Sequence, residues 1–269
     1  MSDNSDGTYA QLRAQTRNDV LEITIVRPER RNALTAAMVS KIRSLITEAE
    51  ERPDLRSILI TGYGTAFCAG FDIGDIQSPG SESAGLERDL VNDLATATTE
   101  SPIPVVAAIN GFAVGAGCDL ALACDIRVGS PGASFSMPPA KLGILYAWPG
   151  MERLLRAVGF ATASEMLLTG DMIHADRALA IGLLSRIAAH DDLIEEARSL
   201  CRRLADNSPV SMQASKESLR LLAKSQLDDR DLGRLARIQE EVWTSSDAKE
   251  GAQAYREGRK PTFVGLEKS

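Results

Sequence analysis

The sequence is poor in the residues from which disulfide frameworks, zinc sites and hydrolase triads are built. It contains four cysteines and two histidines in 269 residues. The cysteines stand apart in apolar surroundings and form no C-x-x-C pair, so we expect no disulfide framework and no metal site. The histidines, His174 and His190, are not near a G-x-S-x-G nucleophile motif, which excludes the usual hydrolase triad. We expect surface or helix-capping roles for both histidines.

The chain also lacks an excess of basic charge, a long apolar run and an N-terminal leader. Its 30 Lys and Arg residues against 37 Asp and Glu residues give a net charge of −7, whereas a nucleic-acid interface needs a clustered basic face. No apolar run approaches the roughly 20 residues that a membrane helix needs. The first residues, MSDNSDGTYAQ, have neither the charged nor the apolar region of a signal peptide. We therefore expect a cytoplasmic protein with no nucleic-acid partner and no membrane partner.

Strand and helix patterns alternate over the first 160 residues. Apolar strands are predicted at 20–26, 57–62, 104–110 and 126–130, and helices at 36–51, 86–100 and 118–125. Thr35 is the expected N-cap of the first helix. Beyond residue 160 the pattern predicts helices alone, at 161–169, 175–182, 191–206, 209–225 and 230–246. This order predicts an α/β fold followed by a helical region suited to self-association.

Two turns rich in glycine and alanine follow buried strands and share one design. The first lies in TGYGTAFCAGFDI at 61–73, and the second is GFAVGAG at 111–117. Neither fits a phosphate-binding motif, because the G-x-G-x-x-G and G-K-[ST] spacings are absent. Free backbone N–H groups in such turns bind negatively charged oxygens, and two converging donors form an oxyanion hole. The alternative is that these glycines only allow close packing between strand and helix.

Four motifs, in this order, resemble the crotonase (enoyl-CoA hydratase/isomerase) superfamily over residues 20–264. They are RPERRNAL, GYGTAFCAGFDI, PVVAAINGFAVGAGCDLALACDIRV and EGAQAYREGRKPTF. The resemblance implies a spiral of ββα units in residues 1–200, which carries the CoA and oxyanion site. It implies a C-terminal helical region, residues 201–269, that builds trimers or dimers of trimers. It further implies an acyl-CoA thioester substrate and no cofactor beyond the CoA moiety of that substrate.

The resemblance assigns the two oxyanion donors to the backbone N–H groups of Phe71 and Ala116. Most relatives have glycine at the second position, and the Cβ of Ala116 narrows the site there. The two glutamates of typical hydratases correspond to Asp119, which is one methylene shorter, and to Pro139, which cannot transfer a proton. Asp119 is therefore the candidate acid–base group. The alternative is a carboxylate that only stabilises a helix N-terminus.

A second catalytic candidate lies in the segment KLGILYAWPG at 141–150. Tyr146 stands in an L-G-x-x-Y pattern that resembles methylmalonyl-CoA decarboxylases, in which loss of CO₂ generates the enolate directly. Trp148 would complete an apolar slot for the carboxylate. The alternative is that both aromatic residues only line an acyl pocket. Relatives that attack an aromatic ring carry an aspartate where this chain has Ala147, which disfavours that reaction.

The resemblance places the CoA moiety beside the RPERRNAL loop and the first turn. Arg30 and Arg31 would pair with its phosphates, because guanidinium groups match phosphate oxygens. The backbone that would border the pantetheine and the adenine is that of Ala33, Cys68, Gly70, Asp72 and Ile73. Lys260 and Phe263 are expected to reach the nucleotide bound by a neighbouring subunit. Asp75 is a further acid–base candidate.

Three functions thus stay open at this level. The first is an enzyme of the hydratase/isomerase type that works with Asp119. The second is a decarboxylase that uses Tyr146. The third is a non-catalytic acyl-CoA-binding protein, because one of the two expected carboxylates is absent. We prefer the first, because a single carboxylate suffices to shuttle a proton in an isomerase.

Overall fold

The computed structural model describes residues 7–9, 11–72, 82–142, 144–223, 228–257 and 259–264. Within them, a seven-stranded sheet has the order β1-β2-β3-β4-β6-β8-β11, and a four-stranded sheet has the order β10-β9-β7-β5. The strands are β1 (Gly7–Tyr9), β2 (Leu12–Arg17), β3 (Val20–Ile25), β4 (Ser57–Gly62), β5 (Ala66–Cys68), β6 (Val105–Ile109), β7 (Phe112–Val114), β8 (Ile126–Gly129), β9 (Ser134–Ser136), β10 (Ile173–His174) and β11 (Arg186–Ile187).

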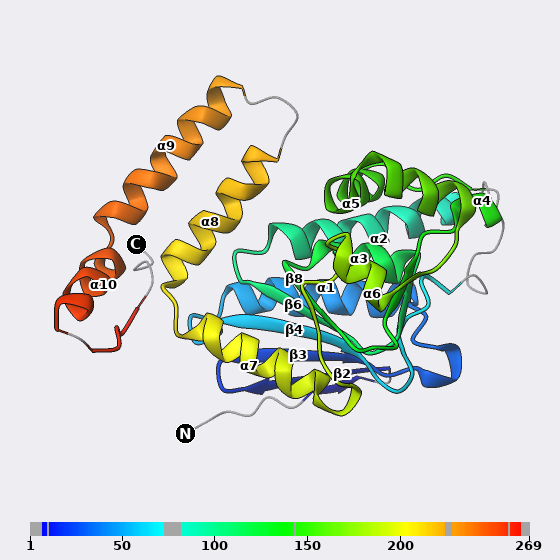
Figure 1. Ribbon diagram of the computed structural model, residues 1–269, viewed down its shortest axis with the longest axis horizontal. Coiled ribbons are helices and arrows are strands. Elements are labelled where there is room, and N and C mark those ends of the chain that lie inside the picture. Colours follow the sequence, from blue (N-terminus) through cyan, green and yellow to red (C-terminus); the bar gives the residue numbers. More distant parts are fainter. Residues whose placement is uncertain are drawn as a thin grey trace.

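Helices cover the sheets, and α7 to α10 follow the last strand, β11 (Figure 1). The α-helices are α1 (Ala36–Glu50), α2 (Glu82–Glu100), α3 (Ala116–Ala123), α4 (Pro139–Leu142), α5 (Trp148–Thr169), α6 (Ala175–Ala180), α7 (Leu193–Ala205), α8 (Pro209–Leu222), α9 (Asp229–Thr244) and α10 (Ser246–Glu257). Thr35 caps α1 as expected, because its hydroxyl accepts a hydrogen bond from the Met38 N–H at 3.3 Å.

The chain repeats a unit of two strands and a helix. In the large sheet β3, β4, β6 and β8 pair in parallel. After β4, β6 and β8 the chain adds β5, β7 and β9, which pair in parallel in the small sheet. Helices α2, α3 and α4 follow these short strands in turn. The predicted spiral of ββα units is therefore confirmed.

The central strands are apolar on both faces because helices cover both. Every residue of β4 and of β6 is buried, as is typical of parallel strands between two helical layers. Ile58 and Ile60 of β4 pack in the cluster that contains the apolar face of α1. Leu59, on the opposite face of the same strand, packs with Leu193 and Leu200 of α7. Because successive side chains of β4 point to opposite faces of the sheet, this strand contributes to both halves of the core.

Strands at both ends of the fold were not predicted. No strand was expected before residue 20, yet β2 pairs with β3 along its whole length through a turn at Asn18 and Asp19. Both turn residues have positive φ, 46° and 64°, which is the conformation of a two-residue hairpin turn. The prediction that strands stop after residue 160 is also wrong, because β10 and β11 follow. Strands of two residues are too short to produce a periodic signal.

The C-terminal helices α8, α9 and α10 stand to one side of the sheets (Figure 1). Helix α7 still packs on the large sheet, so α8 is the first helix to leave it. Leu219 and Leu222 of α8 are 68% and 56% exposed in the single chain. Self-association through residues 201–269 stays a prediction. Among the described residues, none of the helices has the length and apolarity to cross a membrane.

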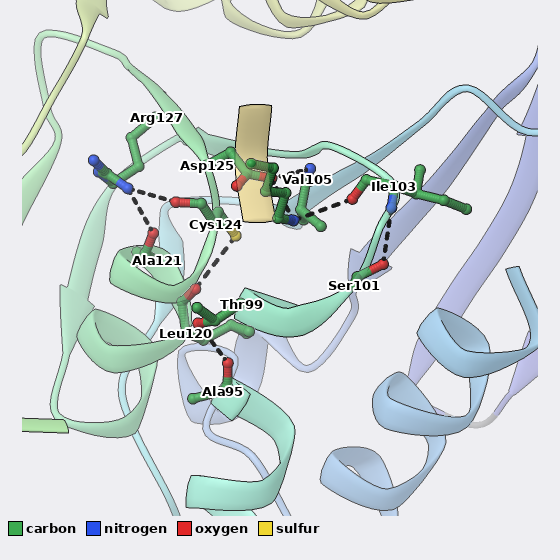
Figure 2. Close-up of polar contacts among 11 residues, drawn as sticks. Ala95, Thr99, Ser101, Ile103, Val105, Leu120, Ala121, Cys124, Asp125 and Arg127 are labelled. Carbon is green, nitrogen blue, oxygen red and sulfur yellow. Dashed lines mark hydrogen bonds and ion pairs between the residues drawn. The ribbon is translucent and has the colours of Figure 1, made fainter. Parts of the chain in front are cut away.

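Helix α3, which follows the second Gly-rich turn, is anchored at its C-terminal end (Figure 2). The Arg127 side chain donates to the Cys124 carbonyl oxygen at 2.6 Å. The Asp125 carboxylate accepts a hydrogen bond from the Val105 N–H at 2.7 Å and another from Lys216 of α8 at 2.8 Å. Burial raises the pKa of Asp125, and Lys216 opposes this shift. These contacts tie α3 to β6 and to α8.

Two buried asparagines fix the loop between β4 and β5. The Asn32 side-chain nitrogen donates to the carbonyl oxygens of Tyr63 at 2.9 Å and of Ala66 at 2.7 Å, and its oxygen accepts from the Arg27 N–H. The Asn110 side-chain nitrogen also donates to the Ala66 oxygen, at 3.0 Å. The two side chains therefore satisfy backbone groups that would otherwise be buried without partners.

The amide of Asn32 is predicted to be essential for this loop. Asn32→Asp keeps the side-chain shape but removes both N–H donors and places a carboxylate against the oxygens of Tyr63 and Ala66. Leaving buried groups unpaired should lower the free energy of unfolding by about 2–4 kcal/mol. Asn207→Asp adds the same charge at an exposed position and is the control. Urea denaturation measures the free energy of unfolding of both variants, and its dependence on urea concentration should stay unchanged. Equal stability of Asn32→Asp and Asn207→Asp contradicts the prediction.

Candidate active site

The first Gly-rich turn carries, beside the Leu34 segment, a backbone N–H group with no acceptor among the described residues. After β5 the chain runs beside the Leu34 segment, where the Leu34 N–H donates to the Gly70 oxygen at 2.8 Å and the Asp72 N–H donates to the Leu34 oxygen at 2.9 Å. In such a parallel pairing, the intervening residue directs its N–H away from the partner. That residue is Phe71. Among the residues that the structure describes, its N–H has no acceptor.

The second Gly-rich turn ends in a free helix N-terminus. Ala116 is the first residue of α3, after the N-cap Gly115 with φ 57°. The first bond within the helix runs from the Asp119 N–H to the Gly115 oxygen at 2.9 Å. The N–H of Ala116 therefore belongs to the groups that a helix leaves unpaired at its start, and no described residue accepts from it.

The two turns contact each other through Gly70. This residue has φ 105°, and a Cβ at its position would lie 2.9 Å from the Val114 oxygen and 3.6 Å from the Ala116 nitrogen. A larger residue would therefore separate the turns, so glycine is required both by the conformation and by the contact. Because β5 and β7 are parallel neighbours, their following turns lie at the same edge. The two turns therefore meet at Gly70, the residue before Phe71, beside the Ala116 nitrogen.

Tyr146 lies against the second turn. A Cβ at Gly115 would be 2.6 Å from the Tyr146 hydroxyl oxygen, so the hydroxyl rests on the backbone one residue before Ala116. Burial, and then the negative charges of nearby groups that include Asp119, raise the pKa of Tyr146. The phenol therefore stays neutral at ordinary pH and keeps its proton to donate. Trp148 is 75% exposed in the single chain and does not enclose Tyr146.

Asp119 is buried in a bidentate ion pair that sequence reasoning missed. Its two oxygens each accept a hydrogen bond from Arg153 of α5 at 2.8 Å. The side chains are 5% and 13% exposed. Gly150 leaves room for the carboxylate, since a Cβ there would lie 3.2 Å from one of its oxygens. Arg153 stands 34 residues from Asp119, in an ordinary amphipathic pattern, so no local signal marks it.

The cysteines in the two turns have protonated thiols of low reactivity. Cys68 and Cys118 are both fully buried. Burial raises the pKa of Cys68 to about 12 and also raises that of Cys118, which the charge of Asp119 raises further. A thiol that stays protonated is a poor nucleophile. The Cys68 side chain packs closely against α3, because a Cβ at Gly117 would lie only 2.8 Å from the Cys68 Sγ atom.

The predicted CoA-binding residues divide into exposed side chains and buried backbone. Arg30 and Arg31 are exposed at the end of a short 3-10 helix, and Arg31 has φ 53°. The buried members are Ala33, Cys68 and Gly70. Asp72 is partly buried, and its carboxylate pairs with Arg27. Ile73 and Asp75 lie outside the described residues.

The two C-terminal candidates contact their own chain. Lys260 is exposed and pairs with Asp206 at 2.5 Å. The Phe263 oxygen accepts a hydrogen bond from Arg56 at 3.0 Å. The expected contact of Lys260 and Phe263 with a neighbouring subunit's nucleotide stays a prediction.

Comparison with known proteins decides the family. A sequence model described as Enoyl-CoA hydratase/isomerase matches residues 15–266. The chain belongs to the enoyl-CoA hydratase/isomerase family. It is 33% identical over 259 residues to a probable enoyl-CoA hydratase of Mycobacterium bovis, covering 96% of this chain and 99% of that protein. It is 32% identical to the 2,3-dehydroadipyl-CoA hydratase of Escherichia coli, covering 95% and 99% of the two chains.

Solved structures agree with this assignment. An enoyl-CoA hydratase from Bacillus anthracis superposes with a TM-score of 0.89 at 29% identity, covering 95% of this chain and 100% of that one. A putative enoyl-CoA hydratase/isomerase family protein from Hyphomonas neptunium gives a TM-score of 0.88 at 34% identity, covering 94% and 97%. The enoyl-CoA hydratase/isomerase family acts on acyl-CoA thioesters. The family and fold predicted from the four sequence motifs are therefore confirmed.

The raised pKa of Tyr146 in this hydratase/isomerase family member predicts a pH-dependent stability. Its pKa in the unfolded chain is near its ordinary value of 10.0 and is higher in the fold. The neutral phenol therefore makes its full contribution to the free energy of unfolding below about pH 10, and this contribution is lost as the pH rises above that value. The difference in unfolding free energy between the natural protein and Tyr146→Phe should fall by up to about 1.4 kcal/mol per pH unit there. Urea unfolding between about pH 8 and pH 11 measures this difference, and a constant value contradicts the prediction.

Proposed function

We propose that this family member binds an acyl-CoA thioester and stabilises its enolate form between the N–H groups of Phe71 and Ala116. The observation that supports this is the contact of Gly70 with the Val114–Ala116 turn, which joins two turns that each carry an unpaired donor. Each oxyanion donor typically contributes about 3–4 kcal/mol to transition-state stabilisation. Both donors belong to the backbone, so the hole does not depend on any side-chain identity except the glycines.

The CoA moiety would lie along the loop that precedes α1. Arg30 and Arg31 expose their guanidinium groups there and would pair with phosphate oxygens. The backbone of Ala33, Cys68 and the following turn would border the pantetheine. Within this proposal the substrate carries its own CoA group and no further cofactor is needed. A cytoplasmic location and assembly into trimers or dimers of trimers accompany the proposal as predictions.

The first candidate reaction is hydration or double-bond isomerisation of an enoyl-CoA, with Asp119 as the proton carrier. The names of the curated relatives favour it. Arg153 engages both Asp119 oxygens, but a carboxylate has about four lone-pair sites, so two stay available for a proton. An isomerase removes a proton from one carbon and returns it to another, which one carboxylate can do. Pro139 supplies no second carboxylate.

The second candidate reaction is decarboxylation of a 2-carboxyacyl-CoA. The position of the neutral Tyr146 hydroxyl against Gly115 favours it. When the bond between Cα and the carboxylate breaks, CO₂ leaves and the electron pair stays on Cα, where it forms the enolate without any base. A phenol beside the hole would orient the departing carboxylate by donating a hydrogen bond. This reaction needs no free carboxylate and so tolerates the pairing of Asp119 with Arg153.

The oxyanion role of Ala116 can be tested by proline substitution. Proline is accepted at the first residue of a helix, where its missing N–H has no helical partner. Ala116→Pro should therefore keep α3 but reduce turnover at least about 10²-fold. Ala36→Pro is the matched control, since Ala36 begins α1 and the preceding Thr35 is extended as a residue before proline requires. Full activity of Ala116→Pro, with both variants folded by circular dichroism, contradicts the oxyanion role.

The reaction itself is decided by three substrates. Crotonyl-CoA, a 3-enoyl-CoA and methylmalonyl-CoA report water addition, double-bond migration and CO₂ release. If the first candidate holds, Asp119→Asn should lower kcat about 10²-fold or more with little change in acyl-CoA binding, while Tyr146→Phe acts less. If the second candidate reaction holds, Tyr146→Phe should be the substitution that lowers kcat more. Tight binding with no turnover of any of the three contradicts both and indicates the acyl-CoA-binding protein.

A further inference from the structure

We propose that Arg27 and Asp72 form a positioning pair that holds the Phe71 N–H in its direction. This inference rests on the proposed function, because it assigns the pair a role in the oxyanion hole. Neither side chain would touch the reacting atoms. Both instead hold the backbone segments that lie next to the Phe71 N–H.

The pair bridges the two segments that flank Phe71. The Arg27 Nη1 atom lies 2.6 Å from an Asp72 carboxylate oxygen. The same nitrogen donates to the Ala33 carbonyl oxygen at 3.1 Å. Ala33 precedes Leu34, the residue that pairs with Phe71. The Arg27 Nη1 atom thus links Asp72, which follows Phe71, to Ala33, which precedes Leu34.

Arg27 is itself held in place, so it can serve as an anchor. Its N–H donates to the Asn32 side-chain oxygen, and its carbonyl oxygen accepts from the Asn32 N–H, both at 2.9 Å. Asn32 is fully buried and is bonded to the loop after β4. The Arg27 side chain is 12% exposed and that of Asp72 is 13% exposed. The pair is therefore a fixed link between the end of β3 and the first Gly-rich turn.

Stability alone does not explain this pair. Burying two charges costs desolvation that their attraction often only offsets. Moreover, the Arg27 Nε–H is buried without an acceptor among the described residues, which adds a further cost. The pair has a more specific effect than stabilisation, because it fixes the positions of the backbone segments beside Phe71. Without it, Gly70 and Asp72 keep their backbone bonds to Leu34, but the side-chain link between Asp72 and Arg27 is lost.

A small rotation at Phe71 would matter for catalysis. A donor acts on the developing oxyanion only when it points at the position that the oxygen will occupy. A displacement of about 1 Å in such a group can reduce the rate about 10²-fold. Loss of the pair should therefore weaken the polarisation of the thioester carbonyl while leaving the contacts of the CoA moiety intact.

The carbonyl stretch of a bound thioester measures this polarisation directly. Butyryl-CoA labelled with ¹³C at the thioester carbonyl carries no double bond to hydrate or move and no carboxylate to lose, so it stays intact in the site. The natural protein should shift its infrared band to lower frequency. Asp72→Asn should lose at least about half of that shift, and kcat on the active panel substrate should fall about 10–100-fold with KM changed less than about threefold. Arg27→Lys, which keeps a cation beside Asp72, should retain part of the band shift and part of kcat.

A matched ion pair elsewhere serves as the control. Arg198 of α7 forms a bidentate pair with Glu22 of β3, at 2.7 and 2.8 Å, on side chains that are 33% and 12% exposed. Glu22→Gln breaks that pair and should leave the carbonyl band unchanged. The double variant Arg27→Met with Asp72→Leu removes both charges together, so it avoids an unpaired buried charge. It should fold and still lack most of the band shift.

The possible outcomes separate this inference from the proposed function. Absence of any band shift in the natural protein, with butyryl-CoA bound, overturns the oxyanion hole itself. A shift in the natural protein that persists in the double variant, shown to be folded by its thermal melt, overturns the positioning role alone. A shift lost in the double variant and kept in Glu22→Gln supports it. An equal loss in Glu22→Gln also overturns it, because the effect would then be general destabilisation.

Discussion

The close approach of two backbone turns is the constraint on which the site depends. Gly70 lies so near the Val114 oxygen and the Ala116 nitrogen that no side chain fits between them. That approach is possible because β5 and β7 are parallel neighbours in the small sheet. Parallel neighbours in turn require the long crossover that α2 and β6 provide. The ββα repeat therefore creates the meeting point of two unpaired N–H groups.

The surrounding polar contacts keep this meeting point rigid. Asn32 and Asn110 both donate to the Ala66 oxygen, at the start of β5. Asp125 and its partners hold the far end of α3 against β6. Each of these side chains forms hydrogen bonds with backbone groups at the start of a strand, β5 or β6. Preorganised donors stabilise a developing charge well because they need not reorient during the reaction.

Residue patterns predicted an α/β fold and the two turns because both leave local signals, whereas the ββα spiral was predicted from the four motifs that resemble the family. Buried strands, a capped helix at Thr35 and glycine-rich turns are all visible as residue patterns. The hairpin at Asn18 and Asp19 also has a local signal, because Leu12 and Ala14 of β2 alternate with the polar residues Arg13 and Gln15. Arg153 left none. An ion pair between residues far apart in sequence depends on how α5 crosses α3, and no spacing rule encodes that crossing.

The proposed site combines backbone donors with side chains that would select the reaction. One donor comes from the first turn and its Leu34 partner segment, and the other comes from the start of α3. Both are backbone groups, so glycine or alanine at position 116 still supplies the N–H. The residues proposed to distinguish reactions, Asp119, Pro139 and Tyr146, lie between the start of α3 and the start of α5. In the proposed site these positions set the proton chemistry, whereas the backbone N–H groups of Phe71 and Ala116 form the oxyanion hole. Arg153 of α5 pairs with both Asp119 oxygens, so this carboxylate is held by a helix outside the two turns, whereas the backbone donors are placed by the sheets.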